Sequence, residues 1–191
     1  NYNMLNESLP YINYATVYPN STLTTLDLSY NYITGSIPVS LIQIITNTIE
    51  NLILNNNLFT GNMNEEILTS TSLVECYLDN NHISGSLTTN IFNYSTDLEY
   101  FSISNNYLTG VLPTSLCKLD GLEYLNFRLN QFSGILPLCI GNMSSMTYLN
   151  FGDLLLVGTI PSTIGQLSYL KVLDMGNNQI TGEIPTTLII P

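Results

Sequence analysis

The chain has 191 residues, of which 45% are hydrophobic and 9% are charged, and its formal net charge is −11. This is enough apolar material for a continuous core, which argues against intrinsic disorder. Only three basic residues oppose 14 acidic ones, so binding to nucleic acid or to anionic lipid surfaces is disfavoured. No apolar run of about 18 residues occurs, and we expect no membrane insertion by this segment.

A single pattern recurs along most of the chain. Residues 1–22 do not complete it, and we expect a partial or irregular N-terminal coil there. Residues 23–191 hold about seven copies of 24–26 residues, the last one truncated, and so regular a period indicates stacked repeats rather than a compact globule. One glycine marks each copy: Gly35, Gly61, Gly85, Gly110, Gly134, Gly158 and Gly182.

Each copy contains a short segment in which apolar and polar residues alternate, as at Leu26 and Leu28 in the first copy. Alternation of this kind predicts a short strand with one buried face. One coil cannot bury that face alone, so we expect neighbouring coils to stack at about 4.8 Å and to share a parallel sheet. The intervening polar residues then line the concave side of the solenoid.

An asparagine follows each strand where the chain turns inward. Its amide can donate and accept, and can therefore satisfy backbone groups that the turn leaves in the core. Leu154 interrupts this column, and we predict a local distortion over residues 152–156. The structural asparagines are Asn31, Asn57, Asn81, Asn106, Asn130 and Asn178.

Most copies then run into Gly-x-Ile-Pro or a close variant, such as Gly110–Pro113 and Gly134–Pro137. Glycine permits a turn with positive φ, and proline fixes the next bend. The segments after the proline, such as residues 115–119, carry apolar residues at helical spacing and predict short helices or 3₁₀ turns on the convex side.

The phrase LxxLxLxxNxLTGxIPxxLxxL, found over about residues 23–185, resembles the plant-type leucine-rich repeat. That family includes the ectodomains of receptor-like kinases and receptor-like proteins, and polygalacturonase-inhibiting proteins. The resemblance implies an α/β solenoid: a right-handed superhelix with a parallel concave sheet, a second short strand at the TGxIP segments, and short convex helices or 3₁₀ turns. It also implies an extracellular or cell-surface location, N-linked glycans, and recognition of a protein or peptide on the concave or lateral face.

The chain departs from that family at its ends. Residues 1–20 lack the paired cysteines of the N-terminal cap, and the sequence stops inside a coil at Pro191. Because solenoids need polar end caps, further copies or repeats joined end to end are expected as an alternative kind of partner.

Cysteines and sequons give candidate covalent sites. Cys117 and Cys139 lie on adjacent coils, compatible with a disulfide, and similar phrases occur in the resembled family; the alternative is two small core residues. Cys76 replaces a core leucine and is expected to be a buried free thiol. Four triplets fit N-x-[ST] and are candidate glycosylation sites, unless chance in an Asn/Ser/Thr-rich chain produced them: Asn6, Asn20, Asn93 and Asn142.

Acidic and tyrosine residues recur in the columns that we expect on the concave side. They predict a groove for a basic or polar ligand, since tyrosine supplies contact area and a hydroxyl. The alternative is an ordinary solvated strand face. The candidate ligand face consists of Tyr77, Tyr100, Tyr124, Tyr148, Glu75, Asp79, Glu99 and Glu123.

No catalytic, cofactor or metal site is expected. His82 is the only histidine, and the glycines occur one per coil rather than in a phosphate-binding loop. The leading hypothesis is a non-catalytic extracellular recognition module. The alternative is a structural component of a cell surface or extracellular fibre, assembled from stacked repeats. Ice binding by a flat Thr/Asn face is less favoured, because the threonines form no regular ladder along the sequence.

Overall fold

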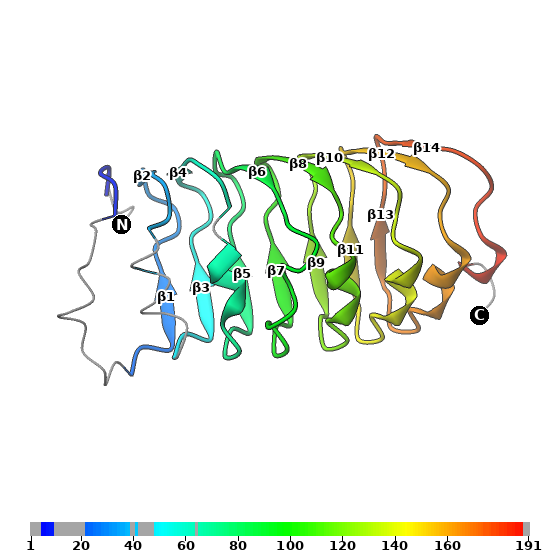
Figure 1. Ribbon diagram of the computed structural model, residues 1–191, viewed down its shortest axis with the longest axis horizontal. Coiled ribbons are helices and arrows are strands. Elements are labelled where there is room, and N and C mark those ends of the chain that lie inside the picture. Colours follow the sequence, from blue (N-terminus) through cyan, green and yellow to red (C-terminus); the bar gives the residue numbers. More distant parts are fainter. Residues whose placement is uncertain (1–4, 10–21, 39–40, 42–47, 64, 189–191) are drawn as a thin grey trace.

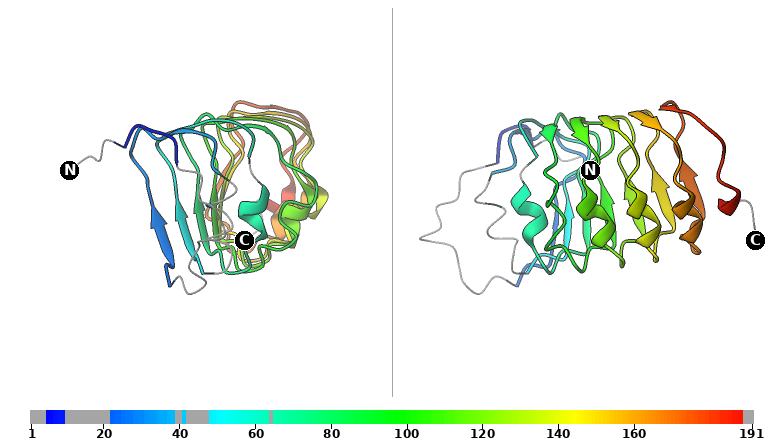
Figure 2. Two further views of the ribbon diagram at one scale, coloured as in Figure 1. Left: turned by 60° about the vertical axis from the view of Figure 1, so that its left-hand side comes forward. Right: turned by 45° about the vertical axis from the view of Figure 1, so that its right-hand side comes forward.

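The computed structural model describes residues 5–9, 22–38, 41, 48–63 and 65–188. The coils stack in one row, from β1 at one end to β14 at the other (Figure 1). Seen obliquely along the row, the strands of the large sheet and the 3₁₀ turns lie on different sides of the stack (Figure 2). The predicted solenoid with a shared parallel sheet is confirmed.

Each coil contributes one short strand to a seven-stranded parallel sheet, here called the large sheet. The register advances by one repeat per strand, so that Leu52 lies beside Cys76 and Leu125 beside Leu149. The strands are β1 (Thr25–Asp27), β3 (Asn51–Ile53), β5 (Glu75–Tyr77), β7 (Tyr100–Ser102), β9 (Tyr124–Asn126), β11 (Tyr148–Asn150) and β13 (Val172–Asp174).

The residues just before and around each repeat glycine form the predicted second row of strands, which lies along the upper edge in Figure 1. Five of them make one parallel sheet, and β2 pairs with β4. These strands are β2 (Thr34–Gly35), β4 (Leu58–Phe59), β6 (Ser84–Ser86), β8 (Tyr107–Val111), β10 (Gln131–Gly134), β12 (Leu155–Gly158) and β14 (Gln179–Ile180).

Hydroxyl side chains recur in this second row immediately before the glycines. The Ser84, Thr109 and Ser133 hydroxyls each donate to the glycine carbonyl of the preceding coil, at 3.2 Å. Serines supply two of these three positions, so the threonines alone still form no regular ladder, whereas serine and threonine together do. Along the sequence, the residues between these hydroxyls obscure the column, which becomes regular only when the coils stack.

The predicted convex turns are 3₁₀ helices. Pro113, Pro137 and Pro161 precede three of them in extended conformation, with φ between −61° and −70°, so each proline sets the direction in which the turn begins. The turns are η2 (Glu65–Thr69), η3 (Thr114–Lys118), η4 (Leu138–Asn142), η5 (Ser162–Gln166) and η6 (Thr186–Leu188).

One continuous apolar core runs through the stack. The Phe101 ring meets Phe92 and Phe127 edge-on, at centroid distances of 5.4 and 5.8 Å, and Phe127 stacks with Phe151 at 5.9 Å. Leucines of the inner strands are fully buried, whereas Leu26 in β1 and Leu173 in β13 are only partly covered, because they belong to the outermost strands of the sheet.

The asparagine column links each coil to its neighbours. The Asn106 amide donates to the carbonyls of Leu78 and Ile103, at 3.0 and 3.2 Å, and its oxygen accepts the Ile83 N–H at 2.9 Å. Ile103 O accepts a second hydrogen bond from Asn130 at 2.9 Å. Each such carbonyl is thus served by two asparagines, one from its own coil and one from the next.

This redundancy explains why the predicted distortion at residues 152–156 is wrong. Asp153 has φ 54°, within the 51–58° range of the same position in the other coils. Without an asparagine at position 154, Phe127 O still accepts from Asn130 and Phe151 O from Asn178. Leu154 itself is buried, so the core gains a side chain where the ladder lacks one.

Candidate ligand-binding face

The first and third residues of each strand in the large sheet point away from the core. We call the surface that they form with the polar residues flanking these strands, such as Asp79, Glu99 and Glu123, the open face. The strand register places Glu75, Tyr100, Tyr124 and Tyr148 in one column across β5, β7, β9 and β11. Tyr77 lies in the neighbouring column, between Ile53 and Ser102. The structure therefore brings the four predicted tyrosines together on one side of adjacent strands.

Hydrogen bonds and ring contacts hold three of these tyrosines, Tyr100, Tyr124 and Tyr148, in fixed positions. The Tyr124 and Tyr148 rings stack with centroids 4.5 Å apart and an interplanar angle of 10°. Tyr100 donates its hydroxyl to a Glu123 carboxylate oxygen at 3.1 Å, and Asn150 donates to the Tyr148 hydroxyl at 3.1 Å. Rings that are ordered before a ligand arrives lose little conformational entropy on binding.

The acidic residues of this face have different roles. Asp79 Oδ1 accepts the Ser104 N–H at 2.8 Å and the Ser104 hydroxyl at 2.7 Å, and also accepts from the Ser102 hydroxyl. Asp79 therefore links its own coil to β7 and to the turn after β7, and its Oδ1 atom already accepts hydrogen bonds. Glu99 is exposed and Glu75 half-buried, so their carboxylates supply negative charge to a ligand.

Burial and neighbouring acids keep the phenols protonated. Burial raises the pKa of Tyr77 to about 12, and the negative charge of Glu75 adds to the effect. The hydrogen bond to Glu123 raises the pKa of Tyr100, and burial raises that of Tyr124. At neutral pH these groups remain uncharged hydroxyls beside carboxylates, an arrangement that offers hydrogen bonds and negative charge together.

Two of the three basic side chains, Arg128 and Lys118, lie outside the columns of the open face. Arg128 bonds Asp153 through Nε at 2.7 Å. The hydrogen bonds from Arg128 and Asn177 lower the pKa of Asp153, and the ion pair sits in the turn that follows β9 and β11. Lys118 donates to Asn93 on the convex side. Net negative charge is consequently concentrated over β5 to β9.

The covalent sites are distributed around the other surfaces. Cys117 and Cys139 form a disulfide between η3 and η4, with Cα atoms 5.7 Å apart. Cys76 is a buried free thiol in β5, and burial raises its pKa.

The sequon residues differ in their surroundings. Asn6 and Asn142 are exposed, whereas Asn93 is half-buried and Asn20 lies outside the described residues. The hydroxyl of Ser95, in the Asn93 sequon, is buried and donates to Leu68 O. Modification of any of the four remains a prediction.

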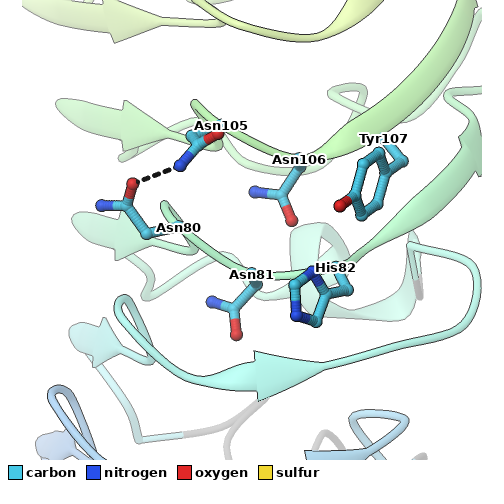
Figure 3. A pocket seen from close by; sticks show the side chains of 6 residues that line it. All are labelled: Asn80, Asn81, His82, Asn105, Asn106 and Tyr107. Atoms are coloured by element: carbon cyan, nitrogen blue, oxygen red, sulfur yellow. Dashed lines mark hydrogen bonds between the residues drawn. The ribbon is translucent and has the colours of Figure 1, made fainter.

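A cavity of about 220 Å³ lies beside the asparagine column and was not predicted from the sequence. Two adjacent coils supply its lining (Figure 3): Asn80, Asn81, His82, Asn105, Asn106 and Tyr107. His82 and Tyr107 are a full repeat apart in sequence, yet their rings stack at 5.7 Å. The only sequence signal for this contact is that the two residues occupy equivalent positions in adjacent repeats.

Across the part of the chain that the structure describes, no group of three or more His, Cys, Asp or Glu side chains could hold a metal ion. In the same residues, no helix has both the length and the apolar character needed to cross a membrane.

The Leucine Rich Repeat family model matches residues 22–44, 97–119, 121–143 and 169–189. Together with the stacked coils and the asparagine ladder, this match identifies the repeats as leucine-rich repeats, and the fold is a leucine-rich-repeat solenoid. A comparison with curated protein sequences finds no significant match.

Solved structures place the chain among plant-type repeats. A TDR receptor is 29% identical, with a TM-score of 0.82 over 86% of this chain. The ectodomain of the Arabidopsis thaliana receptor kinase GASSHO1/SCHENGEN3, in complex with CASPARIAN STRIP INTEGRITY FACTOR 2, is 33% identical, with a TM-score of 0.77 over 87%. The Arabidopsis receptor kinase HAESA ectodomain, in complex with an IDA peptide hormone, is 26% identical, with a TM-score of 0.74 over 98%.

This chain spans 28%, 23% and 35% of those three structures, respectively. The predicted resemblance to plant receptor-like ectodomains is confirmed.

Proposed function

We propose that the chain is a non-catalytic extracellular recognition module that binds a protein or peptide through the open face of its large sheet. One observation carries the proposal: four tyrosines, three of them held by hydrogen bonds or ring stacking, lie with the carboxylates of Glu75, Glu99 and Glu123 on and beside four adjacent strands. Aromatic side chains that need little ordering are the usual anchors of protein interfaces.

The similar structures support the same kind of ligand. Two of the three compared ectodomains were solved in complex with a peptide hormone or integrity factor. The open face of this chain is acidic over β5 to β9, and the whole chain has a formal net charge of −11. A segment that contains lysine or arginine therefore complements it, because cations attract both carboxylates and the faces of tyrosine rings.

Binding of synthetic peptides tests this proposal. Pools of equal length and equal apolar content, one basic, one neutral and one acidic, are titrated against the protein by calorimetry or fluorescence anisotropy. We expect the basic pool to bind and the acidic pool not to bind. Preference for the acidic pool, or no binding by any pool, would contradict the proposed open-face ligand.

Matched variants then locate the bound peptide. Tyr100→Ala removes a ring from the centre of the open face and should weaken binding of the basic pool by about tenfold or more, the loss typical of an interface anchor. Tyr94→Ala removes an exposed tyrosine from the segment beside η3 and should change nothing. Equal losses in the two variants would place the peptide elsewhere.

Glycan analysis tests the proposed extracellular location. When the chain is produced through a eukaryotic secretory pathway, peptide N-glycosidase should reduce its mass, and Asn142→Gln should remove one glycan, because Asn142 is exposed at the end of η4. An unchanged mass after enzyme treatment counts against the secreted assignment.

The solution mass separates the recognition module from the structural alternative. A monodisperse monomer supports recognition. Polymers that grow with protein concentration support assembly from stacked repeats.

A further inference from the structure

The cavity between the third and fourth coils is a second site, separate from the open face. Its wall contains two aromatic rings, His82 and Tyr107, stacked at 5.7 Å with an interplanar angle of 18°. Both side chains are exposed, and Tyr107 retains 52% of its surface. The two stacked rings therefore form one aromatic pair that reaches solvent.

The opposite side of the cavity carries a preordered amide pair. Asn105 Nδ2 donates to Asn80 Oδ1 at 2.8 Å (Figure 3). Among the described residues neither Asn80 Nδ2 nor Asn105 Oδ1 has a further partner. A donor and an acceptor therefore lie side by side and free, in orientations fixed by the bond between the two side chains.

The lining contains no acidic, lysine or arginine side chain. Asn81 and Asn106 are buried, and their amides donate to backbone carbonyls and accept from backbone N–H groups. Asp79, in the turn before Asn80, accepts from Ser104 and Ser102. These features favour a neutral ligand with both an apolar face and hydroxyl groups.

The combination occurs at one coil pair in the described stack. Three coils further along, Asp153 and Asn177 occupy the positions of Asn80 and Asn105, and Asp153 carries an ion pair with Arg128. The positions of the two rings are taken there by Leu155 and Gln179. The pairing of uncharged amides with two rings is thus specific to this cavity and is not imposed by the repeat.

We infer that this cavity binds a single pyranose unit of a neutral glycan. A pyranose has a C–H face that packs on the negative face of an aromatic ring, and vicinal hydroxyls that match an adjacent donor and acceptor. At about 220 Å³ the cavity is smaller than the about 300–1,000 Å³ typical of sites that enclose a drug-sized ligand, so one ring fits and the rest of the glycan stays outside.

The test uses the full chain, folded and then stripped of N-glycans, on an array of neutral hexose and N-acetylhexosamine oligosaccharides, with uronic-acid oligosaccharides as the charged counterpart. The neutral glycan that binds most tightly is then titrated by saturation-transfer NMR. We expect neutral glycans to bind and charged ones not to bind. Absence of binding to any neutral glycan, or preference for uronic acids, would overturn the inference.

Variants locate the bound glycan. Tyr107→Ala should weaken binding about five- to tenfold, the effect of losing one aromatic contact, and Tyr107→Phe should retain it. Tyr32→Ala is the matched control, because Tyr32 is exposed at the same repeat position in the first coil. An equal loss in Tyr32→Ala refutes the site. Binding of basic peptides should be unaffected by Tyr107→Ala, so this inference and the proposed function fail independently.

Discussion

At the scale of single residues, the hydrogen bonds of the buried carbonyls decide whether the fold tolerates the loss of one asparagine from the ladder. Leu78 O and Ile103 O each accept from two asparagines on successive coils. Loss of one asparagine therefore leaves every such carbonyl with a partner. The intact coil at Leu154 is a natural example, because its neighbours Asn130 and Asn178 still serve both carbonyls.

Adjacent asparagines should consequently show coupled effects on stability. Asn106→Leu is expected to cost about 1–3 kcal/mol, because the Ile83 N–H loses its acceptor. Asn106→Leu with Asn130→Leu should cost more than the sum of the two single changes, since Ile103 O then has no partner. The free energies of unfolding come from urea titrations.

A pair without a shared carbonyl is the control for this coupling. Asn81 serves Leu54 O and Leu78 O, whereas Asn130 serves Ile103 O and Phe127 O. The Asn81→Leu and Asn130→Leu double variant should be additive. If the adjacent pair is additive as well, the second hydrogen bond to each carbonyl contributes nothing to stability.

Tyr77 gives the open face a defined response to alkaline pH. Its pKa rises from 10.0 to about 12 on folding, so the folded state favours the neutral phenol. This contribution to stability is complete below pH 10 and is lost as the pH rises through about 12. Tyr77→Phe removes the titration, and its stability should fall less steeply than that of the wild type over that interval.

Urea unfolding at a series of alkaline pH values measures this difference. Tyr94→Phe also removes one phenol, but from an exposed position away from the open face, and should follow the wild-type profile. Identical slopes for the wild type and Tyr77→Phe would mean that Tyr77 ionises in the folded state as easily as in the unfolded chain.

At the scale of elements, most coils consist of a strand, a turn, a second strand and a 3₁₀ helix, whereas the coil of β5 and β6 has only turns on its convex side. The 3₁₀ helices η3 to η6 each pack on the next one along the stack. The disulfide joins η3 to η4 and closes a segment with a sequence separation of 22. A cross-link of this kind restricts the unfolded chain, with a typical stabilisation of about 2–4 kcal/mol.

Reduction of the Cys117–Cys139 bond should therefore lower the melting temperature. The same loss is expected in the Cys117→Ala and Cys139→Ala double variant under oxidising conditions. Thermal melts followed by circular dichroism check both, and adding reductant to the double variant should change nothing further. Cys76 is buried, so a thiol reagent should modify it only on unfolding. If reductant leaves the melting temperature of the wild type unchanged, the expected stabilisation is contradicted.

Elements that depend on local alternation, and the contacts between coils that follow from the repeat itself, could be predicted from the sequence. Contacts between individual polar or aromatic side chains of neighbouring coils could not. Leu52 and Leu125 are recognisable as core residues because each lies in a short alternating segment. The stacking of His82 on Tyr107 depends on how two exposed side chains turn in neighbouring coils, which no local pattern specifies. The engagement of Asp79 by Ser104 escaped prediction for the same reason.

At the scale of the whole molecule, stacking turns a modest charge per coil into an extended field. Each coil adds few acids, but the open-face carboxylates Glu75, Glu99 and Glu123 come from successive coils. The three basic residues of the chain lie toward its C-terminal half, and Arg128 is already paired. The field should therefore steer a cationic ligand toward the middle of the stack.

Ionic strength provides the test of this steering. The Debye length is about 8 Å in physiological salt and about 3 Å at 1 M, so added salt screens the approach of a basic peptide more than the contacts that hold it once bound. We expect the association rate constant of the basic peptide pool to fall steeply with salt, while the dissociation rate constant changes little. Stopped-flow fluorescence resolves the two. Glu99→Gln, which removes one exposed charge without touching the tyrosines, should reduce the salt dependence of association. If salt acts only on dissociation, the ligand is held by direct ion pairs and the extended field has no part in its capture.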